Sequence, residues 1–202
     1  MNEMKNKKVF VAGCGGLGGF LVEMLVRLGV GEVRVADGDV FSPSNMNRQL
    51  YCLPSTLGKS KVVEAKLRWP ETVEAFNRFL DEENVSYLIN GCDLVVDALD
   101  NVASRRILAT ACADAGIPLV HGAIGERNMQ VCAIFPEDAD ILDILYPASS
   151  SLKKYPTFSY VPACCASLQS AIADRILHGD FSDRRKLYLA DLSNFELETV
   201  VL

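Results

Sequence analysis

Long apolar runs and excess positive charge are both missing from this sequence. Apolar runs such as Leu94–Val96 and Ile117–Val120 are far too short to span a bilayer. The polar, basic stretch Met1–Lys8 runs into a predicted strand and not into the apolar region of a signal peptide, so we expect a cytoplasmic protein. The formal net charge of −6 argues against a general nucleic-acid-binding protein, because such proteins normally carry a basic patch.

Paired cysteines are also missing. The 7 cysteines lie at positions 14, 52, 92, 112, 132, 164 and 165, and none of them forms a Cys-x-x-Cys pair. Several lie in apolar stretches, where cysteine acts as a small hydrophobic residue. With no export signal we expect reduced thiols and no disulfides. Structural zinc needs four nitrogen or sulfur ligands, usually in closely spaced pairs, which the adjacent Cys164 and Cys165 cannot supply, so we predict no zinc.

What the sequence does contain is the composition and pattern of an α/β domain. Of its 202 residues 50% are hydrophobic and 23% are charged, as in a globular protein with a full core. The predicted strands cover 8–12, 32–36, 71–76, 93–98, 118–123 and 129–135, and a final hairpin covers 186–201. The predicted helices cover 20–28, 58–67, 81–88, 104–115 and 163–177.

Strands and helices alternate along the chain, and this alternation predicts a fold. We expect a doubly wound, Rossmann-like α/β fold with a mostly parallel sheet and a C-terminal antiparallel hairpin. The stretch 138–162 has three prolines and a serine run, which predicts a crossover loop. No repeat, low-complexity tract or linker divides the chain, so we expect one domain over residues 1–202.

A glycine-rich loop follows the first predicted strand. Gly13-x-Gly15-x-x-Gly18 opens the first helix, and Asp37 ends the next strand. In such sites the glycines let the backbone approach a phosphate, the helix N-terminus supplies N–H donors, and the acid holds a ribose. By itself this loop favours an NAD-dependent oxidoreductase, and a turn without a ligand is the plainer alternative. Gly58-Lys59-Ser60 looks like the end of a P-loop, but Leu53 stands where that motif needs glycine.

A second group of polar residues favours ATP over NAD. The loop Asp39–Leu57 is unusually long for a βαβ unit, and its part up to Leu50 carries several polar side chains. Lys61 follows this loop, and Asp100 ends a later strand. A triphosphate needs cations, a metal-binding carboxylate and polar groups for the ribose and base, whereas an NAD enzyme needs no such cations here. Each of these residues has a plainer interpretation when it is taken alone. Arg48 could be a solvated charge in a loop, Lys61 could lie on the surface of a helix, and Asp100 could cap a helix.

Several separate segments, in order, resemble the ThiF/MoeB/HesA family, whose members are related to the ubiquitin-activating enzymes. They are GCGGLG, DGDVFSPSNMNRQL, the lysine of GKSK, and ALDN, with LVHGAIGERNMQVCAIFP and LYLADLSNFELETVVL also fitting. The chain is short and is most similar to the compact ThiS adenylyltransferases, the ThiF branch. This resemblance implies ATP-dependent adenylylation of the C-terminal glycine carboxylate of a ubiquitin-like sulfur carrier ending in Gly-Gly, ThiS-like and serving thiamine biosynthesis, with release of pyrophosphate.

The same resemblance implies a site. Arg48 would contact the phosphates, Lys61 would neutralise the α-phosphate, and Asp100 would bind Mg²⁺; these three would be the catalytic residues. Gly15 and Gly16 would lie against the α-phosphate. The nucleotide-binding set would comprise Gly13, Gly15, Gly16, Gly18, Asp37, Asp39, Asn45, Asn47, Arg48, Gln49, Lys61, Asp100 and Asn101, with Asp37 on the ribose.

The sequence also departs from the pattern of that family. Many relatives bind zinc through two Cys-x-x-Cys pairs, and some carry a reactive cysteine in the crossover loop; residues 138–163 contain no cysteine. We therefore expect an enzyme that stops at the adenylate. Cys164 and Cys165 fall on a predicted helix among small apolar residues, which favours a core position over a nucleophile. Relatives often begin with a helix whose arginine reaches the partner subunit's site. The only basic residues among positions 1–8 are lysines, so that arginine is either dispensable here or replaced by another residue. A homodimer is expected by analogy.

The sequence contains three further polar residues of interest and allows several alternative functions. His121 is predicted to be a packed polar residue and not a base, and Arg105 and Arg106 are predicted to serve helix packing or surface charge. The alternatives to a ThiS-like carrier are a MoaD-like carrier and a modified tRNA base, the latter opposed by the acidic composition. A non-catalytic ATP-binding scaffold and an NAD-dependent oxidoreductase are the alternatives from other classes.

Overall fold

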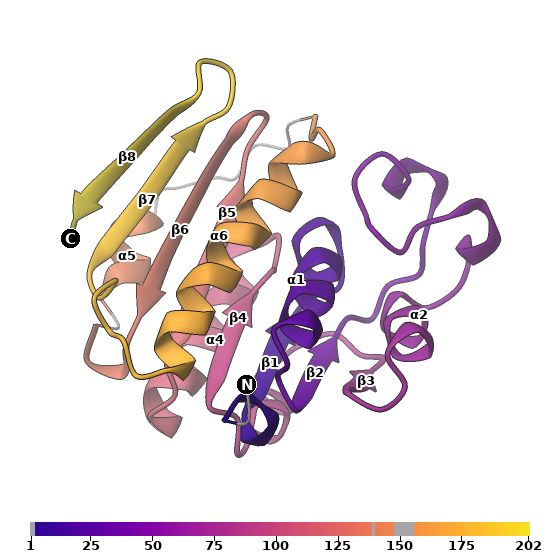
Figure 1. The fold of residues 1–202 in the computed structure, drawn as a ribbon, viewed down its shortest axis with the longest axis horizontal. Coiled ribbons are helices and arrows are strands. Elements are labelled where there is room, and N and C mark those ends of the chain that lie inside the picture. The colour runs from indigo at the N-terminus through magenta and orange to yellow at the C-terminus, as the bar shows by residue number, and fades with distance from the viewer. Residues whose placement is uncertain (1–2, 139, 148–155) are drawn as a thin grey trace.

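The computed structural model describes residues 3–138, 140–147 and 156–202. The strands are β1 Lys8–Ala12, β2 Glu32–Ala36, β3 Val73–Phe76, β4 Leu94–Asp97, β5 Leu119–Ile124, β6 Asn128–Ile134, β7 Lys186–Asp191 and β8 Glu196–Val201. The helices are α1 Gly16–Arg27, α2 Lys61–Arg68, α3 Val85–Ile89, α4 Val102–Ala115, α5 Ile141–Leu145 and α6 Tyr160–Leu177. The strands form one eight-stranded sheet in the order β3-β2-β1-β4-β5-β6-β7-β8, shown in Figure 1.

The sheet is parallel on one side and antiparallel on the other. β3, β2, β1, β4 and β5 run parallel, and β6, β7 and β8 continue the sheet in antiparallel fashion. The parallel strands are joined by crossover segments that contain helices, whereas short turns join β5 to β6 and β7 to β8, as each pairing requires. The expected doubly wound fold with a C-terminal hairpin is therefore confirmed.

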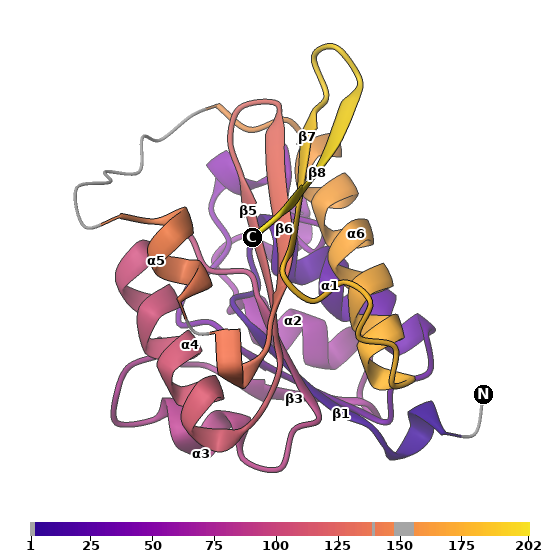
Figure 2. The same ribbon diagram turned by 90° about the vertical axis from the view of Figure 1, so that its left-hand side faces the viewer.

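The two faces of the sheet bury different residues of the same strands. In β1, Val9 and Val11 belong to the core beneath α1, α2 and α6, while Phe10 and Ala12 belong to the core beneath α3, α4 and α5. Figures 1 and 2 show these two helical layers on opposite sides of the sheet. Because β1 is covered on both faces, its sequence is apolar at consecutive positions and does not alternate.

All five predicted helices are present, but each begins two to four residues away from its predicted start. The shifts of the first and the last helix concern the site. The first helix begins at Gly16, not at residue 20, so the glycine loop enters it directly. The last helix begins at Tyr160, not at 163, with Pro162 in its first turn, where a missing N–H leaves no helix hydrogen bond unmade.

The predicted crossover loop 138–162 contains structure of its own. A short turn at Pro136–Asp138 enters it and α5 lies inside it. Helical spacing does not show in five residues, which explains why α5 was not predicted. Residues 139 and 148–155 of that stretch lie outside the described residues. Within the described ranges, no helix combines the length and the apolar character that crossing a membrane requires.

Candidate active site

The glycine loop lies where the sheet changes its winding direction, between β1 and the neighbouring β4. Gly13 has a φ of +98°, and a Cβ on it would lie 2.8 Å from the carbonyl oxygen of Ala98. A Cβ on Gly18 would lie 1.9 Å from the carbonyl oxygen of Gly13. Both glycines are buried, so packing within the loop itself requires them. Open parallel sheets bind ligands at such a crossing, outside the carboxyl ends of the strands.

Gly15 and Gly16 serve a different purpose from the two buried glycines. Both are partly exposed at the beginning of α1, and a Cβ on either would meet only side-chain atoms at 3.6 Å or more. No packing constraint excludes a side chain there, yet glycine leaves the amide groups of the helix N-terminus open. An anion can approach this end of α1 closely.

Two aspartates and a buried lysine border the glycine loop. Asp37 follows β2, and its Oδ2 accepts a hydrogen bond from the Cys14 N–H at 2.8 Å. The Nζ of Lys61 lies 2.8 Å from Oδ2 of Asp39 and 3.8 Å from Oδ2 of Asp37. The Lys61 side chain is only 7% exposed, whereas that of Asp39 is 55% exposed. Lys61 is therefore not the helix-surface residue that its position at the start of α2 allowed.

The segment before α2 is folded by its own polar side chains. Asn45 closes a short turn, because its Oδ1 accepts a hydrogen bond from the Ser42 N–H at 3.0 Å. The Arg48 guanidinium donates to the Ser44 carbonyl oxygen and to Oδ1 of Asn47, both at 2.9 Å. Asn47 in turn donates to the Thr157 carbonyl oxygen at 2.9 Å, so this segment is tied to the chain just before α6.

Arg48 and Gln49 face the open end of α1. The Cγ of Arg48 lies 3.9 Å from the Cβ position of Gly16, and Nε2 of Gln49 lies 3.6 Å from that of Gly15. Gln49 is 8% exposed, and its Oε1 is buried without a hydrogen-bond partner among the described residues. Leaving a buried acceptor unpaired is costly, so this oxygen fits a donor supplied by a bound molecule.

Asp100 and Asn101 lie beside the glycine loop, since Gly13 packs against Ala98 and Leu99. Asn101 is the cap of α4: its Oδ1 accepts the Ser104 N–H at 2.8 Å, and its Nδ2 lies 3.4 Å from Oδ1 of Asp100. The alternative that Asp100 caps this helix is wrong. Asp100 is exposed and forms no ion pair with any residue in the described ranges, so its carboxylate is available to a cation.

The structure thus gathers the predicted site at one edge of the sheet. The loops after β1, β2 and β4 carry Gly15, Asp37 and Asp100. The segment before α2 brings Arg48 to them, and the first residue of α2 is Lys61. Of the polar residues predicted to touch a nucleotide, Asn45 and Asn47 use their side chains to fold this segment.

One aromatic residue at this edge was not predicted. Phe79, in the loop after β3, is 65% exposed. A Cβ on Gly38 would lie 2.7 Å from its ring, so the ring rests directly on the backbone between Asp37 and Asp39. The signal for it was the apolar pair Phe79-Leu80 in the polar stretch that follows an edge strand.

His121 is a packed residue, as predicted. It is fully buried, and its Nδ1 lies 2.7 Å from Oδ2 of Asp97. Burial lowers the pKa of His121, and the hydrogen bond to Asp97 offsets this only in part. The pKa of Asp97 is also lowered, because Arg105 and His121 outweigh the opposing effect of burial. His121 is therefore a neutral imidazole beside the ion pair of Asp97 and Arg105.

The cysteines are free thiols, as expected. Cys165 is fully buried in α6, burial raises the pKa of its thiol, and the core position favoured for it is confirmed. Cys164 is half-buried. In the described part of the chain no three His, Cys, Asp or Glu side chains gather closely enough to hold a metal ion. The absence of zinc stays a prediction.

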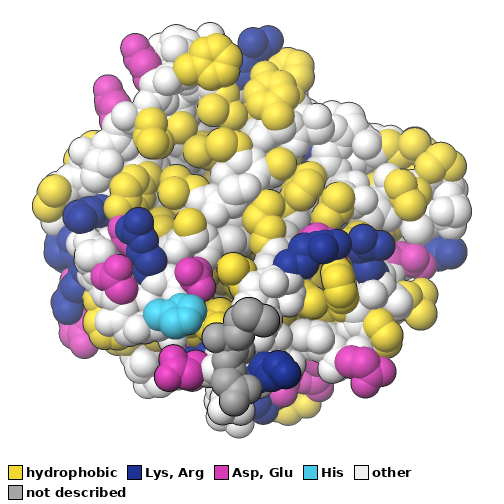
Figure 3. Space-filling view, viewed as in Figure 1, with side chains coloured by type: hydrophobic (Ala, Val, Ile, Leu, Met, Phe, Trp, Pro, Cys, Tyr) yellow, Lys and Arg dark blue, Asp and Glu magenta, His cyan; other side chains and the backbone are white. Residues whose placement is uncertain are grey.

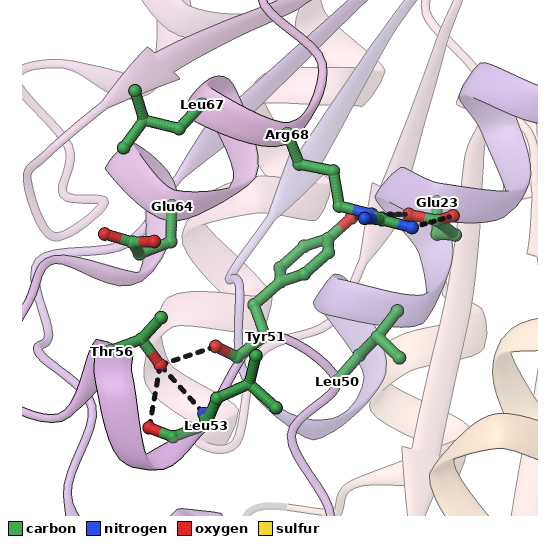
Figure 4. Close-up of a pocket in the computed structure, with 8 residues that line it drawn as sticks. All are labelled: Glu23, Leu50, Tyr51, Leu53, Thr56, Glu64, Leu67 and Arg68. Carbon is green, nitrogen blue, oxygen red and sulfur yellow. Dashed lines mark hydrogen bonds and ion pairs between the residues drawn. The ribbon is translucent and has the colours of Figure 1, made fainter.

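A separate pocket of about 530 Å³ opens between α1, α2 and the segment before α2. Figure 4 shows its lining, in which Arg68 from α2 meets Glu23 from α1 near the ring of Tyr51. The lining residues are Glu23, Leu50, Tyr51, Leu53, Thr56, Glu64, Leu67 and Arg68. None of the predicted site residues is among them, so this pocket is distinct from the candidate site.

Comparison with known proteins gives the same family by a separate route. The model of the ThiF family matches residues 1–201. The SAMP-activating enzyme E1 of Haloferax volcanii is 32% identical over 96% of this chain and 76% of its own length. The sulfur carrier protein adenylyltransferase of Thermus thermophilus is 33% identical over 87% of this chain and 71% of its own. The tRNA threonylcarbamoyladenosine dehydratase of Haemophilus influenzae is 35% identical over 79% of this chain and 64% of its own length.

Solved structures share the fold. The crystal structure of E. coli MccB with succinimide superposes with a TM-score of 0.83 at 19% identity, over 99% of this chain and 65% of that chain. This chain therefore spans about two thirds of the structure that it matches. At such low identity the likeness concerns the fold alone.

Proposed function

This chain belongs to the ThiF family, and on that premise we propose that it is a nucleotidyltransferase that uses ATP to adenylylate the C-terminal glycine carboxylate of a ubiquitin-like sulfur carrier. One observation supports the proposal most strongly. The open N-terminus of α1 lies beside the buried Lys61, Arg48, and Asp37 at the position of a ribose-binding aspartate. That combination suits a nucleoside triphosphate more than NAD, which needs no extra cations at this position.

The proposed reaction forms one bond and breaks one bond at phosphorus. A carboxylate oxygen of the carrier attacks the α-phosphorus of ATP, the bond between this phosphorus and the bridging oxygen breaks, and pyrophosphate leaves with the electron pair. The carboxylate is already ionised at neutral pH, so no general base is required. What the protein supplies is position and positive potential.

Lys61, Arg48 and the α1 N-terminus would provide that potential. Lys61 is held by Asp39 and Asp37, and a phosphate group would compete with these carboxylates for its ammonium. Arg48 would turn from its contacts with Ser44 and Asn47 toward the phosphates. The unpaired Oε1 of Gln49 would accept a hydrogen bond from the nucleotide, and Asp37 would hold the ribose.

Mg²⁺ and the base would bind at opposite ends of this site. Asp100 fits the metal because its exposed carboxylate forms no ion pair with the described residues, and Asn101 lies beside it. When bound, Mg²⁺ would neutralise charge on the phosphates. Phe79 would offer an apolar surface to the base next to Asp37.

The finer assignments are proposals of the same kind. We propose a ThiS-like carrier ending in Gly-Gly, hence thiamine biosynthesis, with a MoaD-like carrier as the alternative. The relative in T. thermophilus is named for a sulfur carrier protein, which supports a carrier substrate. We further propose one domain, a homodimer and a cytoplasmic location, with no structural zinc.

A modified base of tRNA is the second candidate substrate. The dehydratase relative of H. influenzae is named for threonylcarbamoyladenosine in tRNA, and its identity to this chain is as high as that of the carrier enzymes. The net charge of −6 opposes a polyanionic substrate.

Pyrophosphate exchange tests the proposal. The protein is incubated with ATP, Mg²⁺, labelled pyrophosphate and a ThiS-like carrier ending in Gly-Gly, and carrier-dependent formation of labelled ATP is expected. Lys61→Ala and Asp100→Ala should each lose on the order of 2–4 kcal/mol of transition-state stabilisation. Lys59→Ala is the matched control, because the Lys59 side chain is 55% exposed and its one ion pair among the described residues is with Glu64 at 3.5 Å.

Each other result selects another function. Full exchange activity in both variants would contradict the assigned residues. Turnover with modified tRNA and none with the carrier would favour the second substrate. Tight ATP binding without exchange would indicate a non-catalytic scaffold.

A further inference from the structure

A cluster of buried polar side chains lies directly behind the loop that carries Asp100. Its members are Asp97, Arg105, His121, Gln130 and Tyr146, and Asp97, Arg105, His121 and Tyr146 are each no more than 5% exposed. They come from β4, α4, β5, β6 and the residue after α5. The proposed function uses none of them. Asp97 and Tyr146 contact the Arg105 guanidinium, and His121 and Gln130 bond to these two in turn, which helix packing alone does not explain.

Arg105 is the centre of this cluster. Its Nη1 donates to the Tyr146 hydroxyl at 2.5 Å, and its Nη2 donates to the Leu99 carbonyl oxygen at 2.6 Å. Its Nε lies 3.4 Å from Oδ2 of Asp97, which gives an ion pair without a hydrogen bond. Its guanidinium carbon also lies 5.2 Å from the centre of the Tyr146 ring. One side chain therefore joins the end of β4, the following loop and the chain after α5.

The hydrogen bonds of the cluster fit one assignment of protons. With Nδ1–H of His121 donating to Asp97, its Nε2 is an acceptor for the Tyr146 hydroxyl at 3.1 Å. The Tyr146 oxygen then accepts from Arg105 and from Nε2 of Gln130 at 2.9 Å. Both lone pairs and the proton of this hydroxyl are used, so the guanidinium is held in a single orientation.

The cluster acts on the Asp100 loop through the backbone of Leu99. The Leu99 N–H donates to Oδ1 of Asp97 at 2.9 Å, and its carbonyl oxygen accepts from Arg105. Both polar groups of the residue before Asp100 are thus fixed by one ion pair. A buried ion pair is weak evidence for stability, since apolar residues of similar volume often stabilise a core as well. Fixing both polar groups of one residue is what a positioning role requires.

We infer that Arg105 is a positioning residue for Asp100. It holds the Leu99–Asn101 loop so that the Asp100 carboxylate faces the metal–nucleotide complex, and Tyr146 orients Arg105. The inference rests on the proposed role of Asp100. Groups that orient a metal ligand from behind typically change metal affinity by about 10–100-fold when they are removed.

Two measurements on Arg105→Lys and Tyr146→Phe test it. The first is hydrogen–deuterium exchange of the backbone around Leu99 without any ligand, which should become faster in both variants. The second is the Mg²⁺ concentration that half-saturates ATP binding, which should rise by about tenfold or more. Tyr146→Phe keeps the ring against Arg105 and removes only the hydroxyl, so it is the variant that preserves the core best.

Arg106→Met is the matched control. Arg106 lies on the same helix and also contacts the chain around α5, through Asp143 and the Tyr146 carbonyl oxygen, whereas the hydrogen bond to the Leu99 carbonyl oxygen comes from Arg105. It should change neither measurement. Equal values for Arg106→Met and the two cluster variants would overturn the inference, as would unchanged exchange around Leu99 in Tyr146→Phe. If the wild-type protein shows no Mg²⁺-dependent ATP binding, the proposed function fails, and the exchange measurement still decides whether Arg105 fixes the loop.

Discussion

At the scale of single residues, Gly16 and Gly18 separate what the glycine loop needs for folding from what it needs for binding. A methyl group on Gly18 would overlap the Gly13 carbonyl oxygen, whereas one on Gly16 would meet Pro162 at an ordinary 3.6 Å. Gly16 is also the first residue of α1, where alanine is a better helix former.

Alanine at these two positions should therefore have opposite effects. We expect Gly18→Ala to destabilise the protein by about 1–3 kcal/mol, as overpacking typically does. Gly16→Ala should unfold at the wild-type temperature or slightly above it, yet bind ATP at least about tenfold more weakly, because its methyl group covers the open helix end. Thermal unfolding and ATP titration measure the two effects. Equal ATP affinity in Gly16→Ala and wild type would mean that no phosphate lies there.

The same scale shows what sequence could and could not predict of the site. Lys61 and Asp100 follow readable patterns, because Lys61 comes directly after the long polar loop that follows β2 and Asp100 comes shortly after the buried strand β4. Arg105 was assigned to packing or surface charge, and only the structure brings its guanidinium to Leu99 and Tyr146. Phe79 was missed for a similar reason, since its contact with Gly38 joins two loops distant in sequence.

At the scale of elements, Glu23 ties α1 to α2 and to the segment before α2. Its carboxylate accepts hydrogen bonds from Arg68 at 3.0 Å, from the Trp69 ring at 2.9 Å and from the Tyr51 hydroxyl at 3.3 Å, and it pairs with Arg27. Burial opposes its ionisation, but these donors outweigh burial and lower the pKa of Glu23 to about 2. One carboxylate thus fixes the helix whose first residue is Lys61.

Glu23→Gln should show a stability difference that depends on pH. The pKa is lower in the folded state than in the unfolded chain, so the contribution of Glu23 is fully present above the ordinary value of 4.5 and is lost as pH falls toward about 2. We expect a loss of about 1–3 kcal/mol at pH 7 that shrinks toward pH 2.5, measured by denaturant unfolding. Glu137→Gln is the control, since Glu137 is 68% exposed. A difference that stays constant with pH would contradict the pKa assignment.

Sequence patterns predicted the regular elements better than the irregular ones. The ranges of β1 and β2 agree with the structure residue by residue, because short β-rich runs bounded by glycine and charge are unambiguous. The start of α1 was displaced because glycine is a poor helix former, and here close packing of the loop outweighs that preference. The α5 helix escaped prediction because it is too short to show a period.

At the scale of the whole molecule, the two cores cannot be separated. Every central strand contributes alternate side chains to both of them, as β1 does with Val9 and Phe10. Unfolding of the helices on one face of the sheet would expose the apolar side chains that the strands contribute to that face. We therefore expect a single unfolding transition in calorimetry, with calorimetric and van't Hoff enthalpies that agree. ATP with Mg²⁺ should raise its midpoint. Two resolved transitions would contradict the one-domain proposal.

The position of β1 beside β4 has a consequence for how the chain reaches its fold. The β5–β6 and β7–β8 hairpins pair segments that are close in sequence, whereas docking β4 on β1 joins Lys8 to Asp93, 85 positions apart. Closing so large a loop is entropically unfavourable and slow. The Ala98 carbonyl oxygen that Gly13 packs against, and the Asp100 loop, arrive only with this event. The proposed nucleotide site would then be among the last parts of the molecule to form during folding, after the C-terminal hairpins.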